Sequence, residues 1–126
     1  MNPEALAALC ERIRAASAWP VPPLQIRVCC PKGHFIVTVV PTVVRFAGQE
    51  LPRMSPAVGR YHSVTRRLRG LRELPSTSEF KFVDEASVEL SCRKCPRWHR
   101  RYEHTRLAAE LAVYALNGDA EHRLPP

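Results

Sequence analysis

The chain has 126 residues, of which 45% are hydrophobic and 25% are charged, and its formal net charge is +7. This length and composition fit one compact domain with a modest core, so we expect residues 1–126 to fold as a single domain. No apolar run reaches the about 18 residues that a membrane span needs, and no basic start precedes an apolar run as in a signal peptide. The sequence therefore predicts a cytoplasmic protein with no membrane partner.

The N-terminal segment, residues 1–18, predicts an amphipathic helix. Asn2 suits the N-cap and Pro3 suits the first helical position. Apolar side chains recur at helical spacing on one face: Leu6, Leu9, Ile13 and Ala16. The proline-rich stretch at 19–23 cannot continue this helix and should act as a stiff connector.

Residues 24–46 predict strands on either side of a tight turn. Alternating apolar side chains up to Cys29 favour a first strand, and the β-branched run after His34 favours a buried second strand. Pro41 should interrupt the second strand, which resumes at residues 43–46 as an edge strand or a neighbouring one.

Residues 47–78 form a basic region whose secondary structure the sequence leaves open. Glycines and prolines divide it, and residues 53–72 contain six arginines and no acidic residue. A short helix at 64–74 and an exposed basic loop fit this pattern equally well.

Residues 79–117 predict a β-hairpin, a second cysteine cluster and a helix. Two short β-rich runs at 80–83 and 87–91 flank an acidic turn. Apolar side chains at helical spacing predict the helix over residues 100–116, and residues 118–126 should form a frayed tail. The chain as a whole predicts an α+β fold, with a small antiparallel sheet, an N-terminal helix and a C-terminal helix.

Four of the five cysteines lie in two short clusters, each of which follows a predicted strand and contains a histidine. The clusters read Cys29-Cys30-Pro31-Lys32-Gly33-His34 and Cys92-Arg93-Lys94-Cys95-Pro96-Arg97-Trp98-His99. A strand that runs into a tight turn of thiolates and imidazole is typical of a zinc knuckle, and zinc prefers four such ligands in a tetrahedron. We therefore expect one structural Zn²⁺ shared by the two clusters, with these ligands: Cys30, His34, Cys92 and Cys95.

Two alternatives stay open for the ligand set. Cys29 is adjacent to Cys30 and could ligate in its place. The other alternative is a wholly local site, because two histidines follow the paired cysteines as in zinc fingers: Cys92, Cys95, His99 and His104. The fifth cysteine, Cys10, falls in the helical apolar pattern and should be a core residue.

The sequence favours no enzyme. Four protein ligands would leave no open position on the metal for water or substrate. The chain lacks a His-Glu-x-x-His motif, a glycine-rich phosphate loop and the His-x-Glu that accompanies the cysteine pair of zinc deaminases. We therefore expect a binding protein.

Basic residues concentrate around the second cysteine pair and in the 53–72 segment. Such clusters attract phosphate backbones, although a solvated charged face and the arginine usage of a GC-rich genome are alternative explanations. Trp98 and Tyr102 lie among the arginines, where they could stack on unpaired bases or pack the predicted helix onto the hairpin. The expected nucleic-acid contacts are Arg66, Arg67, Arg69, Arg97, Arg100, Arg101 and Arg106.

Two knuckles that follow strands, with a helix after the second, resemble a zinc ribbon or a treble-clef finger. Residues 26–34 and 88–95 are similar to the Com-type zinc-binding regulators of phages. The resemblance implies a phage or bacterial regulator that engages nucleic acid in the cytoplasm, which would be the host cytoplasm if the protein is viral. The sequence departs from this pattern because one knuckle uses a histidine and 57 residues separate the clusters.

A protein-interaction module is the alternative function. The same zinc scaffold would then dock on and modulate a host or cellular enzyme such as the transcription machinery, with RNA polymerase as the partner. The strand at 39–46 or the proline-rich loops would form the contact surface.

Overall fold

Helices at both ends of the chain flank strands that form two small sheets. The computed structural model describes residues 2–18, 24–57 and 78–126. The elements are the helix α1 (Pro3–Ala16), the strands β1 (Ile26–Cys29), β2 (Phe35–Phe46), β3 (Gln49–Pro56), β4 (Phe80–Phe82), β5 (Ser87–Cys92) and β6 (Cys95–Glu103), the helix α3 (His104–Leu116) and the strand β7 (Glu121–Arg123). The predicted α+β class, with its N-terminal and C-terminal helices, is confirmed. Neither helix is long and apolar enough to cross a bilayer.

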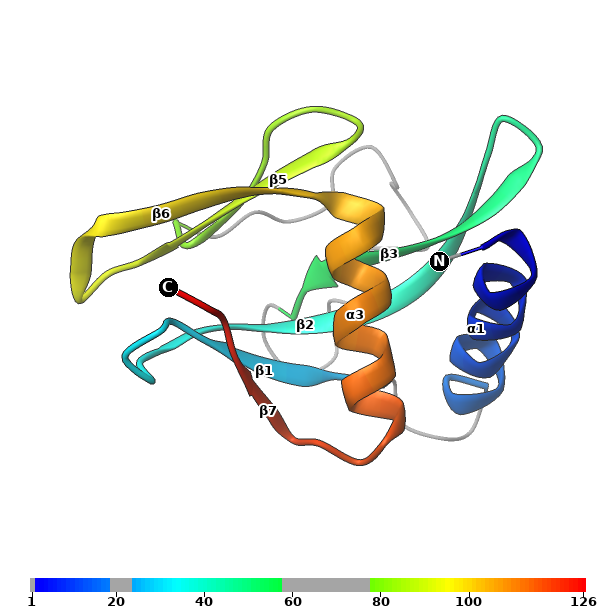
Figure 1. Ribbon diagram of the computed structural model, residues 1–126, viewed down its shortest axis with the longest axis horizontal. Coiled ribbons are helices and arrows are strands. Elements are labelled where there is room, and N and C mark those ends of the chain that lie inside the picture. The colour runs from blue at the N-terminus through cyan, green and yellow to red at the C-terminus, as the bar shows by residue number, and fades with distance from the viewer. Residues whose placement is uncertain (1, 19–23, 58–77) are drawn as a thin grey trace.

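The strands are divided between a four-stranded sheet in the order β3-β2-β1-β7 and a three-stranded sheet in the order β4-β5-β6. All neighbouring strands are antiparallel except β7, which runs parallel to β1. The helix α3 runs across the molecule, while α1 lies at the end opposite the β1–β2 and β5–β6 turns (Figure 1). Those two turns therefore share one end of the fold.

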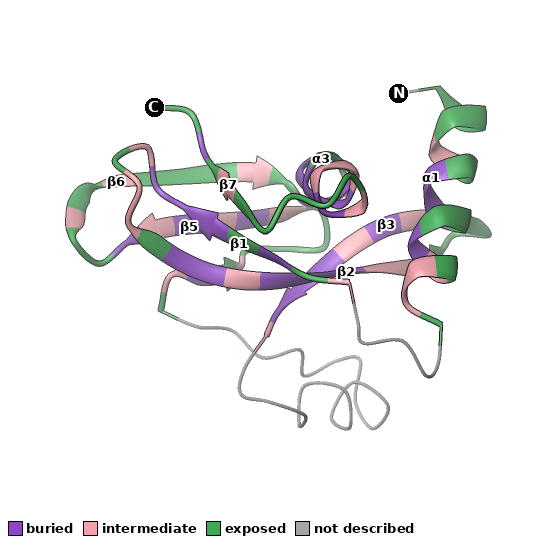
Figure 2. Ribbon diagram, turned by 90° about the horizontal axis from the view of Figure 1, so that it is seen from below, coloured by how far each residue is buried: buried purple, intermediate pink, exposed green. Residues whose placement is uncertain are grey.

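One apolar core joins both sheets to α3. Burial alternates along β5, whereas β1 and β2 also bury consecutive residues, as their coloured segments show in Figure 2. The members of this core include Ile26, Val28, Val39, Phe80, Val88, Leu90, Leu107 and Leu111. Full burial of each such side chain contributes about 1.5–3 kcal/mol. A second, smaller cluster packs α1 against α3 through Leu9, Ile13, Ala109 and Ala112.

The predicted N-terminal helix is confirmed, and its cap explains where it begins. The Asn2 side chain accepts a hydrogen bond of 2.7 Å from the Ala5 backbone N–H, and Pro3 occupies the first turn. Leu9 and Ile13 are buried, so the apolar face follows the spacing in the sequence.

The prediction that Pro41 interrupts the second strand is wrong. The strand β2 runs unbroken past Pro41, which lies opposite Met54 of β3. The Ala57 N–H donates to the Thr38 carbonyl at 2.7 Å, so these two residues form a hydrogen-bonded pair. Hydrogen-bonded and non-hydrogen-bonded pairs alternate along the two strands from this point. The prolines of the hairpin all fall at positions whose backbone nitrogen points away from the partner strand: Pro41, Pro52 and Pro56. No ladder hydrogen bond is lost, so the strand continues.

Two boundaries near the C-terminus also differ from the prediction. Residues 100–103 continue β6 and α3 begins at His104, because pairing with β5 overrides the local helical pattern. Residues 121–123 form β7 in place of a frayed tail. Leu124 is buried, and its N–H donates to the Cys29 carbonyl at 2.9 Å, which secures this segment.

The basic region begins with a strand. Residues 49–56 form β3, which pairs with β2 through a two-residue turn at Ala47 and Gly48, where both residues have positive φ. The predicted alternatives for residues 64–74 lie outside the described residues.

His104 joins the start of α3 to the outer edge of β3. Its Nδ1 lies 3.0 Å from Nη1 of Arg53, and its Nε2 lies 3.0 Å from both the backbone nitrogen and the carbonyl oxygen of Met54. Because a guanidinium only donates, Nδ1 accepts, so Nε2 carries the hydrogen and donates to the Met54 carbonyl. Burial and the positive charge of Arg53 lower the pKa of His104 to about 4.

We expect this histidine to make the protein less stable in acid. The unfolded chain takes up a proton on His104 below about pH 6.5, whereas the folded protein resists protonation until about pH 4. The contribution, roughly 3 kcal/mol, is fully present above pH 6.5 and is lost as the pH falls toward 4. Denaturant unfolding of the wild type and His104→Gln between pH 7.5 and 4 would measure it, because other titrating groups cancel in the difference. A difference in unfolding free energy that does not change with pH would contradict this assignment.

Candidate metal centre

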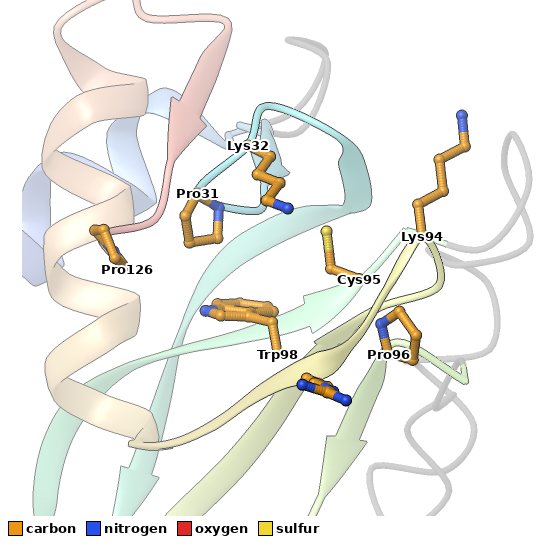
Figure 3. Close-up of a pocket in the computed structure, with 8 residues that line it drawn as sticks. Pro31, Lys32, Lys94, Cys95, Pro96, Trp98 and Pro126 are labelled. Carbon is orange, nitrogen blue, oxygen red and sulfur yellow. The ribbon is translucent and has the colours of Figure 1, made fainter.

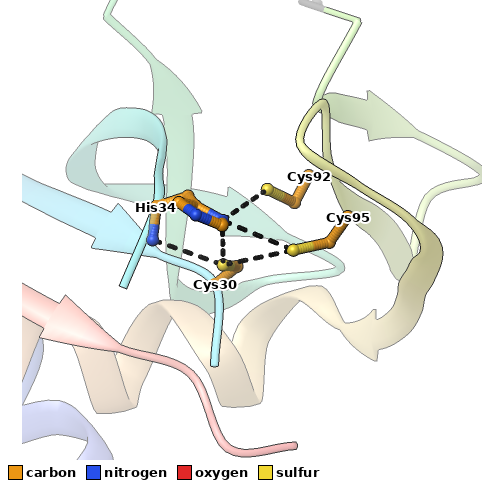
Figure 4. A group of neighbouring side chains, drawn as sticks. All are labelled: Cys30, His34, Cys92 and Cys95. Carbon is orange, nitrogen blue, oxygen red and sulfur yellow. Dashed lines mark hydrogen bonds between the residues drawn. The ribbon is translucent and has the colours of Figure 1, made fainter. Parts of the chain in front are cut away.

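The two cysteine clusters lie in neighbouring hairpin turns. Cys30 and His34 occupy the β1–β2 turn, and Cys92 and Cys95 flank the β5–β6 turn (Figure 4). The strand register shifts just before each turn, between Val28 and Cys29 and between Ser91 and Cys92. Such irregularities re-aim side chains. Both turns therefore direct their ligands toward the same point.

The four side chains form a compact tetrad. The Nδ1 atom of His34 lies 3.4 Å from the Sγ atoms of Cys30 and Cys95 and 3.8 Å from Sγ of Cys92. The Sγ atoms of Cys30 and Cys95 are 4.0 Å apart, and all four ligand atoms lie within 4.8 Å of one another. A tetrahedral zinc ion with bonds of about 2.3 Å to sulfur and about 2.0 Å to nitrogen separates its ligands by about 3.5–3.8 Å. These residues are thus able to bind a metal ion such as zinc.

Backbone amides of the first turn favour the thiolate form of Cys30. The His34 N–H donates to Sγ of Cys30 at 3.3 Å, while the Gly33 N–H donates to the Cys30 carbonyl at 2.8 Å. Burial raises the pKa of the Cys30 thiol, but the N–H groups of His34 and Lys32 and the neighbouring thiols outweigh it, and the net effect lowers that pKa. The thiolate is the form that binds metal.

Cys29 points away from this tetrad. It is buried, and its Sγ donates to Oε1 of Glu121 on β7 at 3.2 Å. Burial and this hydrogen bond raise the pKa of Cys29 to about 11, so it is a protonated thiol at neutral pH. Of the two adjacent cysteines, only Cys30 faces the other ligands. Cys10 is buried in α1, as predicted.

The wholly local site does not form. His104 is bound to β3, and His99 is exposed on β6 opposite Ser91. A strand advances about 3.3 Å per residue, so β6 carries both histidines away from Cys95. A helix starting at residue 100 would have been needed to bring them closer, and the chain is extended there.

The predicted nucleic-acid residues do not form one group. Arg97, Arg100 and Arg101 are exposed on β6, whereas the sequence predicted a helix from residue 100. Arg106 is exposed on α3, where it lines a separate hollow with Glu103 and Glu110. The remaining three, Arg66, Arg67 and Arg69, lie outside the described residues.

The structure places four residues to which the sequence assigned no single role, namely the aromatic residues Trp98 and Tyr102 and the lysines Lys32 and Lys94. Trp98 and Tyr102 are partly buried against the core, on the β6 face that also carries Arg100. Lys32 and Lys94 were not among the predicted binding residues, yet both line one hollow with Arg97. Lys32 reaches toward Cys95, whereas Lys94 points outward from the rim (Figure 3). Their places at the tips of the two knuckles are the sequence feature that could have indicated this.

The fold and the tetrad define a small α+β protein in which a candidate Cys₃His metal centre joins two β-hairpins of different sheets. Comparisons of this chain with protein-family models, curated proteins and solved structures found no match.

We expect the purified protein to bind one Zn²⁺ per chain. Cys95→Ser and His34→Ala should each lose the metal in the presence of a weak chelator, because three remaining ligands bind zinc less tightly. His99→Ala and Cys29→Ser are the controls and should retain it. Elemental analysis measures the metal, and full retention in both Cys95→Ser and His34→Ala would contradict the assignment.

We expect a substitution of Gly33 to weaken the metal centre. Its φ is +87° in the turn between the ligands Cys30 and His34, and an added Cβ would also displace the guanidinium of Arg123, whose Nη2 would lie 2.7 Å away. Gly118 is a matched control with φ +91° and open space around it, so alanine there bears only the left-handed backbone cost of about 1–2 kcal/mol. Chelator competition should release zinc from Gly33→Ala at a lower chelator concentration than from Gly118→Ala. Equal release from both variants would show that the Gly33 turn does not support the site.

Proposed function

We propose that this protein is a zinc-stabilised binding module that engages nucleic acid through the basic surface around its metal centre. The observation that carries the proposal is the charge of the two ligand-bearing turns. Residues 29–34 and 92–97 hold four cations and no acidic residue: Lys32, Arg93, Lys94 and Arg97. The pairing of the two hairpins gathers charge that lies 57 residues apart in the sequence.

The positive charge of these four residues is larger than the negative charge that a zinc-loaded centre would carry. A Zn²⁺ ion with three thiolates and a neutral imidazole carries a net charge of about −1. Arg93 pairs with Glu79 at 2.9 Å, and within the described residues no ion pair involves Lys32, Lys94 or Arg97. About two positive charges are left over, and such a surplus attracts phosphate.

The rest of β6 adds less to this surface. Arg101 lies opposite Glu89, which in turn lies opposite Lys81, so this face of the sheet carries both signs of charge. Arg100 donates to the carbonyl oxygen of Pro126. The phosphate-binding surface in this proposal is therefore the knuckle end, centred on Lys32, Lys94 and Arg97.

A regulatory role of the phage or bacterial type, in a reducing cytoplasm that keeps the thiols available, follows from the resemblance of the two knuckles to Com-type proteins. A binding role also suits a centre whose four protein ligands leave no position for substrate. The alternative docking strand at 39–46 pairs with β3 along its whole length, while β1 pairs with β2 only as far as Val39 on the other side.

We expect binding to a labelled mixed-sequence oligonucleotide to weaken steeply as salt rises. In fluorescence anisotropy with the zinc-loaded protein, the double variant Lys32→Ala/Lys94→Ala should bind more weakly and reduce the slope of log K against log salt by about 1 per lost phosphate contact. Lys81→Ala, which removes an exposed lysine on β4 at a distance from the knuckles in the sequence, is the matched control and should behave as the wild type.

Two results would contradict the proposal. One is the absence of binding at low salt by the zinc-loaded protein. The other is a protein partner, such as RNA polymerase, that stays bound in a pull-down from nuclease-treated lysate while oligonucleotides do not bind.

A further inference from the structure

A hollow of about 510 Å³ opens beside the metal centre. Three separate segments line it, namely the first knuckle, the second knuckle with the start of β6, and the last residue of the chain (Figure 3). Its lining residues are Pro31, Lys32, Lys94, Cys95, Pro96, Arg97, Trp98 and Pro126. The volume lies in the range of sites that hold a small organic ligand.

The lining combines a flat apolar wall with positive charge. The Trp98 ring lies near Pro31 and Pro126, while Lys32 and Lys94 come from the two knuckles (Figure 3). Arg97 adds a third cation, and no aspartate or glutamate side chain lines the hollow, while the backbone oxygen of the terminal residue Pro126 accepts a hydrogen bond from Arg100. A fitting ligand therefore has a planar group that can stack on an aromatic ring and a negative group beside it. A nucleotide has both, since its base is planar and its phosphate is anionic.

We propose that this hollow binds one unpaired nucleotide of a single-stranded nucleic acid. The base stacks on Trp98, and the flanking phosphates contact Lys32, Lys94 and Arg97. This inference rests on the proposed nucleic-acid function and specifies it, because a base in a duplex is already stacked and paired and does not enter such a site without being flipped out. The protein therefore prefers single strands to duplexes.

The metal centre and this site are mechanically linked. Cys95 is both a member of the metal-binding tetrad and a lining residue of the hollow, and Trp98 follows it on the same strand. Lys32 lies between the ligands of the other turn. Removal of the metal frees both walls of the hollow, so preference for single strands is lost in the metal-free protein.

The test uses the zinc-loaded full chain and a fluorescein-labelled 12-nucleotide oligothymidylate, alone or annealed to its complement. Anisotropy should show tighter binding to the single strand by about tenfold or more, and Trp98→Leu should weaken that binding by about 5- to 100-fold while duplex binding changes little. Trp98→Phe, which keeps a stacking ring, should retain most of the affinity.

A second measurement needs no substitution at Trp98, so it tests whether a base stacks on Trp98 even if Trp98→Leu does not fold. The chain has two tryptophans and three tyrosines, so a Trp19→Phe variant emits from Trp98 alone when it is excited at wavelengths that tyrosine does not absorb. Unlabelled oligothymidylate should quench this emission at the concentrations where anisotropy shows binding, because a stacked base contacts the indole ring.

Three outcomes would overturn the inference. Equal affinity for single strand and duplex, with no quenching of Trp98, rejects the nucleotide site and leaves the proposed function standing. No binding of either oligonucleotide rejects both. Quenching by a glutamate-rich peptide, without any oligonucleotide binding, assigns the hollow to an acidic protein ligand.

Discussion

The contact between two hairpin turns, Cys30 with His34 and Cys92 with Cys95, is the constraint on which the rest of the molecule depends. It links the two sheets at one end of the fold, in addition to the apolar core that both sheets share. The turns are separated by 57 residues, and a bound ion would close that long loop. Loop-closure entropy grows only slowly with loop length, so one metal site can tolerate a long insertion between its halves. The departure from a compact ribbon is therefore compatible with a single shared site.

The same constraint places the basic surface. Lys32 and Lys94 lie at the tips of the turns that carry the ligands, and Arg97 follows Cys95 on β6. Each lysine is held near the other only as long as the turns remain paired. In the proposed function, the metal therefore has two roles, because it stabilises the fold and holds the phosphate-binding surface together. Its negative thiolates also lower the cost of bringing these cations together.

The ligands could be predicted from the sequence because their signals are local. The Cys92-x-x-Cys95 spacing and the turn from Cys30 to His34 both depend on a few neighbouring residues, whereas the choice between Cys29 and Cys30 stayed open in the sequence. The start of α3 could not be found this way, because residues 100–103 are extended only through their pairing with β5. The effect of Pro41 also depends on register, which is set by the partner strand. The hollow beside Cys95 depends on the meeting of three distant segments, and its only local signal is the position of Lys32 and Lys94 at the tips of the two knuckles.

The edges of the sheets give a reason to favour phosphate over an added protein strand. The outer edge of β3 has prolines at positions 52 and 56, which lack an N–H, and His104 occupies the Met54 position between them. At the end of β6, the His104 N–H donates to the Ala86 carbonyl. Because the direction of backbone hydrogen bonding alternates along an antiparallel strand, the backbone groups of His99 and Arg101 point away from β5. An added strand would have to place its side chains beside Arg97 and Arg101. Charges on an edge strand discourage such pairing, whereas a phosphate backbone needs only the arginine side chains.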